Sequence, residues 1–96
     1  MIGVFVTFRY EDGVDAAAVT RIAETAGERF RGMPGLRNKF FTVDSQAGEA
    51  RNFYVWESED AARAFFTPEL TELVTGLYGV PPDISYVEIA ELVDNS

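Results

Sequence analysis

Few side chains in this sequence can do chemistry. Histidine and cysteine are absent, and lysine occurs once, at Lys39. Thiolate catalysis, histidine bases and metal sites built on these side chains are therefore excluded, whereas a carboxylate site for a hard cation stays possible. A desolvated Lys39 could act as a base or neutralise an enolate or phenolate. The alternative, which the sequence leaves open, is a lysine on the solvent side of its strand.

Lys39 falls within a predicted β-hairpin. Residues 36–44 and 50–57 have the composition of strands, and the short turn 45–48 joins them. If residues 44 and 49 close the turn, the register follows directly. The pairs are then Lys39 with Tyr54, Phe41 with Asn52, and Arg37 with Trp56. A slip of one residue would change every pair.

Three side chains of the second hairpin strand could assist Lys39. Asn52 and Trp56 could orient and stack on a planar aromatic substrate, and Tyr54 could donate a hydrogen bond to a substrate oxygen. Structural explanations remain open beside these. Trp56 could simply pack in an interface, and Tyr54 could be a buried tyrosine whose hydroxyl bonds the backbone.

The remaining elements predict an α+β fold. Residues 2–10 read as a strand, residues 15–31 as a helix capped by Asp15, and residues 83–93 as a final strand. Between the hairpin and that strand, Ser58 and Thr67-Pro68 predict two helix starts. The order β-α-β-β-α-β predicts one ferredoxin-like domain over residues 1–96, with a four-stranded antiparallel sheet and both helices on one face.

The helices leave the other face of such a sheet open. From the alternation along each strand, the side chains expected under the helices are Val4, Val6, Phe8, Phe40, Phe53 and Val55. Those expected on the open face are Phe5, Phe41, Tyr54, Trp56 and Tyr86. So many aromatic rings exceed the apolar area that a monomer usually exposes. We therefore expect a homodimer that packs sheet to sheet and leaves a ligand pocket between the sheets.

The charge balance argues against two classes of partner. The chain has 96 residues and a net charge of −8, with a pI near 4.3. Nucleic acids and anionic membrane surfaces would both repel it. No apolar run reaches the roughly 20 residues of a membrane span, and the opening residues 1–4 carry no charged leader. A cytoplasmic location is therefore expected.

Several stretches resemble a known family. Gly35-Leu36-Arg37-Asn38-Lys39-Phe40-Phe41-Thr42, Gly48-Glu49-Ala50, and Phe53-Tyr54-Val55-Trp56-Glu57 before an alanine-rich helix are similar to the dimeric α+β barrel superfamily. Within it, the chain most resembles YdhR-type mono-oxygenases, which are relatives of the antibiotic-biosynthesis monooxygenases. The resemblance implies two ferredoxin-like subunits that form a barrel. It also implies ligands bound between each sheet and its helices or in the enclosed cavity.

The same resemblance bears on the reaction. Characterised oxygenases of the superfamily work without metal, haem or flavin and carry an asparagine and a tryptophan four residues apart, a spacing that Asn52 and Trp56 match. The aromatic and basic positions that follow in those oxygenases have no counterpart here, because Ala62 and the Pro81-Pro82 region stand in their place, and the sequence departs from the oxygenase pattern there.

We therefore expect a mono-oxygenase without cofactor or metal that acts on a small aromatic or polyketide-like substrate. Its expected catalytic residues are Lys39, Asn52 and Tyr54, and its expected substrate-binding residues are Phe5, Arg37, Phe41, Trp56 and Tyr86. Two alternatives remain open. One is a non-catalytic module that binds hydrophobic metabolites, and the other is a polyketide cyclase or isomerase that uses the same pocket.

Overall fold

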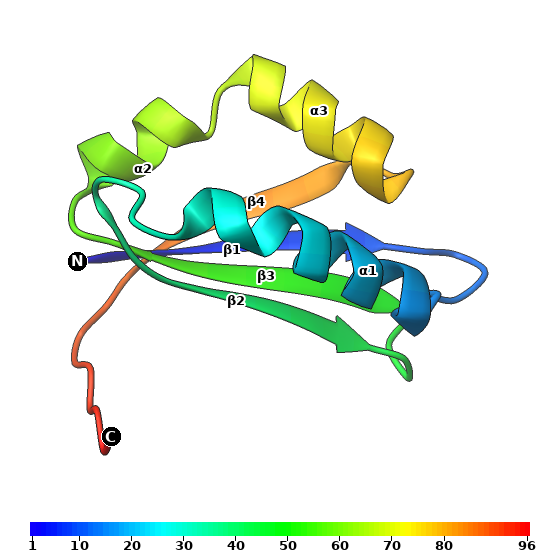
Figure 1. Ribbon diagram of the computed structural model, residues 1–96, viewed down its shortest axis with the longest axis horizontal. Helices are drawn as coiled ribbons and strands as arrows, with labels where there is room; N and C mark the ends of the chain where they lie inside the picture. The colour runs from blue at the N-terminus through cyan, green and yellow to red at the C-terminus, as the bar shows by residue number, and fades with distance from the viewer.

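The computed structural model describes residues 1–96 and has helices on one face of a four-stranded antiparallel sheet (Figure 1). The strands are β1 (Ile2–Arg9), β2 (Leu36–Asp44), β3 (Glu49–Trp56) and β4 (Pro82–Glu88), arranged in the order β2-β3-β1-β4. The helices are α1 (Ala16–Ala26), α2 (Glu59–Phe65) and α3 (Pro68–Tyr78), and a 3₁₀ turn, η1 (Gly27–Phe30), extends α1. The predicted ferredoxin-like order is confirmed, with the second helical segment divided in two. None of the helices has the length and apolar character needed to cross a bilayer.

The helix starts follow the predicted caps. The side chains of Asp15, Ser58 and Thr67 accept hydrogen bonds from the backbone N–H three residues later, at 3.1–3.2 Å. Pro68 separates α2 from α3, because proline suits a first helical position and cannot continue a preceding helix. Gly79, with a φ of 85°, ends α3 in a left-handed conformation that few other residues adopt.

Two predicted elements extend several residues too far, whereas the other strand boundaries differ by at most one residue. The helix expected over residues 15–31 ends at Ala26 and tightens into η1, which begins at the poor helix former Gly27. The strand expected over residues 83–93 ends at Glu88, which pairs with Ile2, the first residue of β1, and β4 pairs with no other strand. Beyond it the chain leaves the sheet as an extended tail (Figure 1).

The hairpin register is largely as predicted. Lys39 pairs with Tyr54 and Phe41 pairs with Asn52. An irregularity between Leu36 and Asn38 leaves Arg37 unpaired, and Leu36 takes the predicted place of Arg37 opposite Trp56. One extra residue on a strand commonly produces such a bulge, and alternation alone cannot reveal it.

The predicted faces of the sheet need a larger correction. Val4 of β1 pairs with both Tyr54 of β3 and Tyr86 of β4, and directly paired residues project to the same side of a sheet. The residues that share the helix-covered side with Val4, Val6 and Phe8 are therefore Lys39, Phe41, Asn52, Tyr54, Trp56 and Tyr86. The placement of Phe41, Tyr54, Trp56 and Tyr86 on the open face is wrong. So is the placement of Phe40, Phe53 and Val55 under the helices.

The open face is smaller in aromatic area than predicted, yet it remains apolar. Phe5 and Phe53 pack with ring centroids 4.6 Å apart, and Phe40 lies 6.3 Å from Phe53. Phe40 is 52% exposed and Val87 is 37% exposed. We call Phe5, Phe40, Phe53 and Val87 the open-face patch.

Candidate active site

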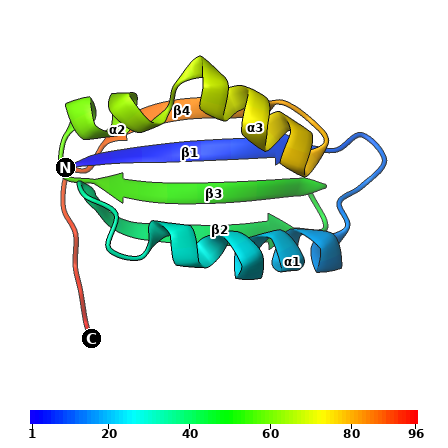
Figure 2. The same cartoon turned by 45° about the horizontal axis from the view of Figure 1, so that its top comes forward.

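A cavity of about 170 Å³ lies between the sheet and the helices. Figure 2 shows α1 running along β2 and the α2–α3 segment lying over β1 and β4, with β3 between them. Side chains from α1, η1, α2 and α3 form its walls, and side chains from all four strands form its floor. Twenty residues line the cavity and 16 of them are hydrophobic. This composition is typical of a small-molecule site with a few placed polar groups.

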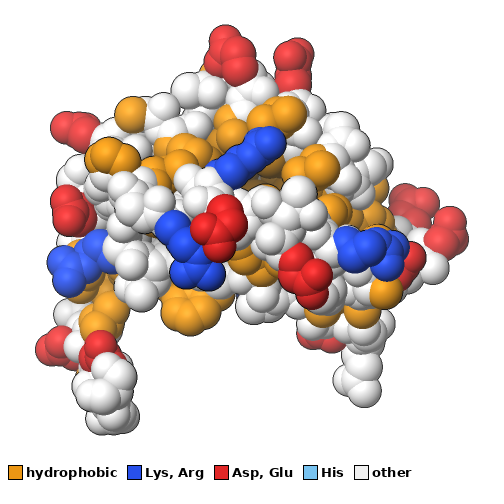
Figure 3. Space-filling model, in the orientation of Figure 1, with side chains coloured by type: hydrophobic (Ala, Val, Ile, Leu, Met, Phe, Trp, Pro, Cys, Tyr) orange, Lys and Arg blue, Asp and Glu red, His pale blue; other side chains and the backbone are white.

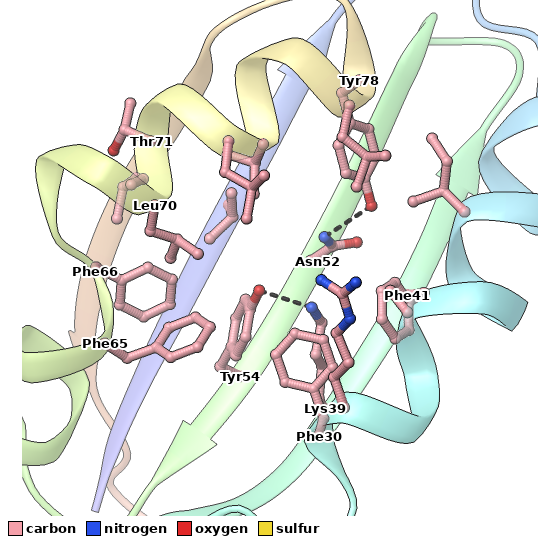
Figure 4. A pocket seen from close by; sticks show the side chains of 18 of the residues that line it. Phe30, Lys39, Phe41, Asn52, Tyr54, Phe65, Phe66, Leu70, Thr71 and Tyr78 are labelled. Atoms are coloured by element: carbon pink, nitrogen blue, oxygen red, sulfur yellow. Dashed lines mark hydrogen bonds between the residues drawn. The ribbon is translucent and has the colours of Figure 1, made fainter.

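Lys39 enters this cavity from β2 and lies among aromatic rings (Figure 4). Its Nζ is 3.6 Å from the ring centroid of Phe30, 4.1 Å from that of Phe41 and 4.3 Å from that of Tyr54. Desolvation lowers the pKa of Lys39 to about 7. The three ring faces favour the ammonium form and so oppose part of that effect. Desolvation is the larger effect, so Lys39 loses its proton at a lower pH than an exposed lysine does.

Tyr54 is the hydrogen-bond partner of Lys39. Nζ donates to the Tyr54 hydroxyl at 2.7 Å. Burial raises the pKa of Tyr54 well above its ordinary value, with a smaller contribution in the same direction from Tyr78. The phenol therefore stays protonated while Lys39 exchanges its proton. The pair provides one proton acceptor and one hydroxyl at a single point of the cavity.

Asn52 forms a second polar pair with Tyr78 of α3 (Figure 4). Its Nδ2 donates to the Tyr78 hydroxyl at 3.2 Å, and its Oδ1 has no hydrogen-bond partner within the chain. Because Asn52 is only 2% exposed, an unpartnered amide oxygen there has a real energetic cost. Oδ1 is therefore a buried acceptor whose hydrogen-bonding capacity no group of the chain uses.

Four other predicted site residues lie outside this cavity. Trp56 is buried beneath α2, with its ring centroid 5.3 Å from that of Phe65, and its Nε1 has no partner within the chain. Phe5 belongs to the opposite face of the sheet. The last two are Arg37, which is exposed beside the β2 bulge, and Tyr86, whose ring lies under the Arg63 guanidinium at 4.3 Å. The structure therefore brings together Lys39, Phe41, Asn52 and Tyr54, and separates the rest.

Sequence reasoning missed Tyr78, Phe65 and Phe66 as wall residues. Tyr78 follows the apolar stripe of α3 at the helical spacing from Val74, so its burial could have been predicted. Its hydrogen bond to Asn52, 26 positions earlier, could not have been predicted without the tertiary structure.

The charge of the cavity wall differs from that of the whole chain. Lys39 and Arg29 both line the cavity, and no aspartate or glutamate does, although the chain carries a net charge of −8. Figure 3 shows Lys and Arg side chains among the hydrophobic atoms of this face, with acidic groups mostly towards its edges. An anionic group in a ligand would therefore meet positive charge here. No cluster of three or more acidic, histidine or cysteine side chains is placed to hold a metal ion.

The geometry defines a ferredoxin-like α+β protein with an apolar cavity between its sheet and helices. No family model matches the sequence, and no curated protein matches it significantly. Solved structures do match. The first is the monooxygenase from the ActVA-Orf6 gene of Streptomyces coelicolor in complex with nanaomycin D, at a TM-score of 0.68 and 25% identity, covering 99% of this chain and 92% of that one.

Two structures with lower sequence identity have the same fold. SnoaB, a cofactor-independent oxygenase from Streptomyces nogalater, matches at a TM-score of 0.65 and 15% identity over 96% of this chain and 95% of that one. NE2512 of Nitrosomonas europaea, a protein of unknown function, matches at a TM-score of 0.69 and 14% identity, over 99% of this chain and 94% of that one. The chain is thus similar in fold to antibiotic-biosynthesis monooxygenase-like proteins of the dimeric α+β barrel superfamily. The narrower likeness to YdhR-type proteins is not confirmed.

Proposed function

We propose that this protein is a cofactor-independent mono-oxygenase that acts on a small aromatic or polyketide-like compound. The observation that supports it most is the Lys39–Tyr54 pair inside an apolar cavity, where Nζ and the hydroxyl lie 2.7 Å apart. Two of the structural neighbours are oxygenases, one of them cofactor-independent by its description. An aromatic substrate suits walls built from Phe30, Phe41, Phe65 and Phe66.

The proposed reaction begins with proton transfer. Neutral Lys39 accepts a proton from an acidic C–H or O–H of the substrate, and the ammonium then pairs with the enolate or phenolate it has produced. The Tyr54 hydroxyl, held at Lys39 Nζ, donates a hydrogen bond to the same anionic oxygen. Asn52 Oδ1 accepts a hydrogen bond from a second substrate hydroxyl and fixes the ring in place.

Oxygen chemistry follows from the electron-rich anion. The anion transfers electrons to O₂, and a new carbon–oxygen bond forms at the activated carbon. The O–O bond then breaks, so that a CH₂ group becomes a carbonyl and the second oxygen atom leaves as water. Apolar walls exclude bulk water, which would otherwise protonate the anion. The cavity volume of about 170 Å³ is close to the size that holds one benzene ring, so the cavity can take the reacting ring of a larger substrate.

We also propose that the protein is a homodimer. The open-face patch is apolar and lies on the sheet face away from the helices. Packing the two sheets together would remove that patch from water, as the barrel architecture of the superfamily implies. The ligand cavity lies on the other face, within one chain. The cavity therefore does not lie between the two sheets, where the sequence had led us to expect a pocket. The contact between the sheets of two chains stays a prediction.

Oxygen consumption with a panel of phenols, anthrones and 1,3-diketones tests the proposed reaction. Lys39→Met should reduce turnover by about 10³-fold, within the range of general acid–base catalysis. Arg21→Met is the matched control, since it removes one exposed cation from α1 outside the cavity and should leave turnover unchanged. Full activity in Lys39→Met would remove Lys39 from the mechanism.

Native mass spectrometry of the freshly purified protein separates the alternatives. A retained hydrophobic metabolite with no oxygen uptake would favour the binding module. Conversion of the substrate to an isomer without oxygen uptake would favour a cyclase or isomerase. Either result would contradict the oxygenase.

A further inference from the structure

The amine of Lys39 has a second reactivity that proton transfer does not use. Besides this side chain, the only amine in the chain is the terminus at Met1, which is 46% exposed. The Lys39 amine points into an apolar cavity, has no carboxylate among the lining residues, and lies 2.7 Å from a phenol. An unprotonated amine in an apolar cavity, beside a hydroxyl that can hydrogen-bond to a carbonyl oxygen, is also a nucleophile towards carbonyl carbon.

We propose that Lys39 binds 1,3-dicarbonyl compounds covalently, by condensation of its Nζ with one carbonyl group to give a conjugated enaminone. The inference rests on the proposed function only in using the same cavity. It names a substrate class, the β-diketones, and an activity that needs no oxygen.

The step is balanced without an oxidant or reductant. Nζ forms a bond to one carbonyl carbon, and that oxygen takes up a proton to give a carbinolamine. The carbon–oxygen bond then breaks and water leaves, with the Tyr54 hydroxyl supplying the proton to the departing oxygen. Overall, Nζ loses one proton and the central CH₂ group loses one proton, which Tyr54 takes up to restore its hydroxyl. The product is therefore a neutral N–H enaminone.

The cavity favours this product over a simple imine. A simple imine of lysine is basic and would become a cationic iminium, which an apolar site without a carboxylate destabilises. An enaminone spreads the nitrogen lone pair over the remaining carbonyl and stays neutral. It is also planar, so it can stack against the rings of Phe30 and Phe41, which already lie within 4.1 Å of Nζ. Desolvation, which lowers the pKa of Lys39 to about 7, leaves much of the amine unprotonated and reactive.

The test uses pentane-2,4-dione and intact-protein mass spectrometry on the full-length protein. One equivalent should add with the mass of the dione less one water, and peptide mapping should place it on Lys39. Labelling at about pH 7 should be at least about tenfold faster than that of an exposed lysine, because an ordinary lysine is almost wholly protonated there. Half-maximal labelling rate should fall near pH 7.

The matched control moves the single lysine without changing the number of amines. Arg37→Lys in a Lys39→Met background places it at an exposed position two residues earlier, beside the bulge of β2. Tyr54→Phe retains the amine and the ring and should slow labelling about tenfold. Labelling of Lys39 no faster than the control lysine, or labelling of Met1 in its place, would overturn the proposal, and unchanged labelling in Tyr54→Phe would overturn the role of the hydroxyl.

Oxygen uptake distinguishes this inference from the proposed function. Lys39-dependent labelling in a protein that never consumes oxygen supports the covalent activity and contradicts the oxygenase. Oxygen consumption without labelling of Lys39 supports the oxygenase and contradicts the covalent activity.

Discussion

Both faces of this sheet carry aromatic rings, but the groups that surround the rings differ between the two faces. On the helix-covered face, Phe30 and Phe41 surround an amine, and Asn52 keeps a buried amide oxygen without a partner in the chain. On the open face, Phe5 and Phe40 both pack on Phe53, and the exposed guanidinium of Arg51 lies 5.3 Å from the Phe5 ring centroid.

The difference separates two physical tasks. Burying a polar group without a partner costs stability, so the unpartnered amide oxygen of Asn52, which lines the cavity, supports the proposed ligand site on the covered face. The open-face patch carries no such cost, and its residues gain most when another apolar surface covers them. The first face therefore suits a ligand, and the second suits a copy of the same chain.

The largest expected effect comes from placing a charge on the open face. Phe40→Asp should raise the dimer dissociation constant by about 10³-fold, roughly 4 kcal/mol, because a symmetric interface buries the change twice. Since Phe40 is 52% exposed in the single chain, the monomer fold should be retained. Sedimentation velocity across a range of concentrations measures the effect.

Ala17→Asp is the matched control for that charge. It adds the same negative charge at an exposed position of α1, away from the sheet, and should leave the dimer intact. If the unaltered protein is itself monomeric at micromolar concentration, the role assigned to the open face is wrong.

The two faces also show what the sequence can and cannot establish. Alternation within one strand gave Val4, Val6 and Phe8 a common side, and turn length paired Lys39 with Tyr54. The register between β3 and β1 decides which side of the hairpin lies on the same face of the sheet as Val4. These two strands lie far apart in the sequence. Trp56, Tyr54 and Asn52 pair with Ile2, Val4 and Val6, and no local pattern fixes that match. An error of one residue therefore moved Phe41, Tyr54 and Trp56 to the wrong face together.

The site itself divides in the same way. Lys39, Asn52 and Tyr54 were accessible to sequence reasoning because they are rare or polar residues on predicted strands. Tyr78 was not, because it reaches Asn52 only through the packing of α3 on the sheet. Arg37 was misplaced by a bulge that has no sequence signature beyond its position near Gly35.

A smaller effect should come from removing the buried amine. Lys39→Met should stabilise the fold by about 2 kcal/mol at neutral pH, because an apolar side chain of similar length replaces a group that desolvation disfavours. Between about pH 7 and the ordinary lysine pKa of 10.5, the unfolded chain holds a proton that the folded chain has released. The free energy of unfolding should therefore rise with pH across that window. Below about pH 7, Lys39 is charged in both states, so the full cost of burying its charge should lower the stability of the folded protein.

Urea unfolding at about pH 6 and about pH 9, at one fixed protein concentration, measures this. In the Lys39→Met variant, the free energy of unfolding should change much less between these two pH values. Lys39→Arg is the matched variant, since it keeps a cation that does not lose its proton in this range and should be less stable at both pH values. A wild-type stability independent of pH over the window would mean that Lys39 stays protonated in the folded protein.

The smallest effect tests whether Tyr78 and Asn52 act as a pair. Tyr78→Phe keeps the ring stacked on Phe8, whose centroid is 3.8 Å away, but removes the hydroxyl that accepts from Asn52 Nδ2. Asn52 then has no side-chain partner within the chain, so stability should fall by about 1 kcal/mol. Asn52→Leu, which removes the amide, should cost little or even stabilise.

The double variant completes the cycle. If the pair acts together, Tyr78→Phe should cost almost nothing in the Asn52→Leu background, and the difference between the two costs is the coupling energy. Tyr10→Phe serves as the comparison, since its hydroxyl donates to the backbone oxygen of Tyr78 at 2.8 Å and does not touch Asn52. Equal costs of Tyr78→Phe in both backgrounds would show that the covered face holds two independent polar groups. The support for Asn52 as an oriented ligand-binding amide would then be lost.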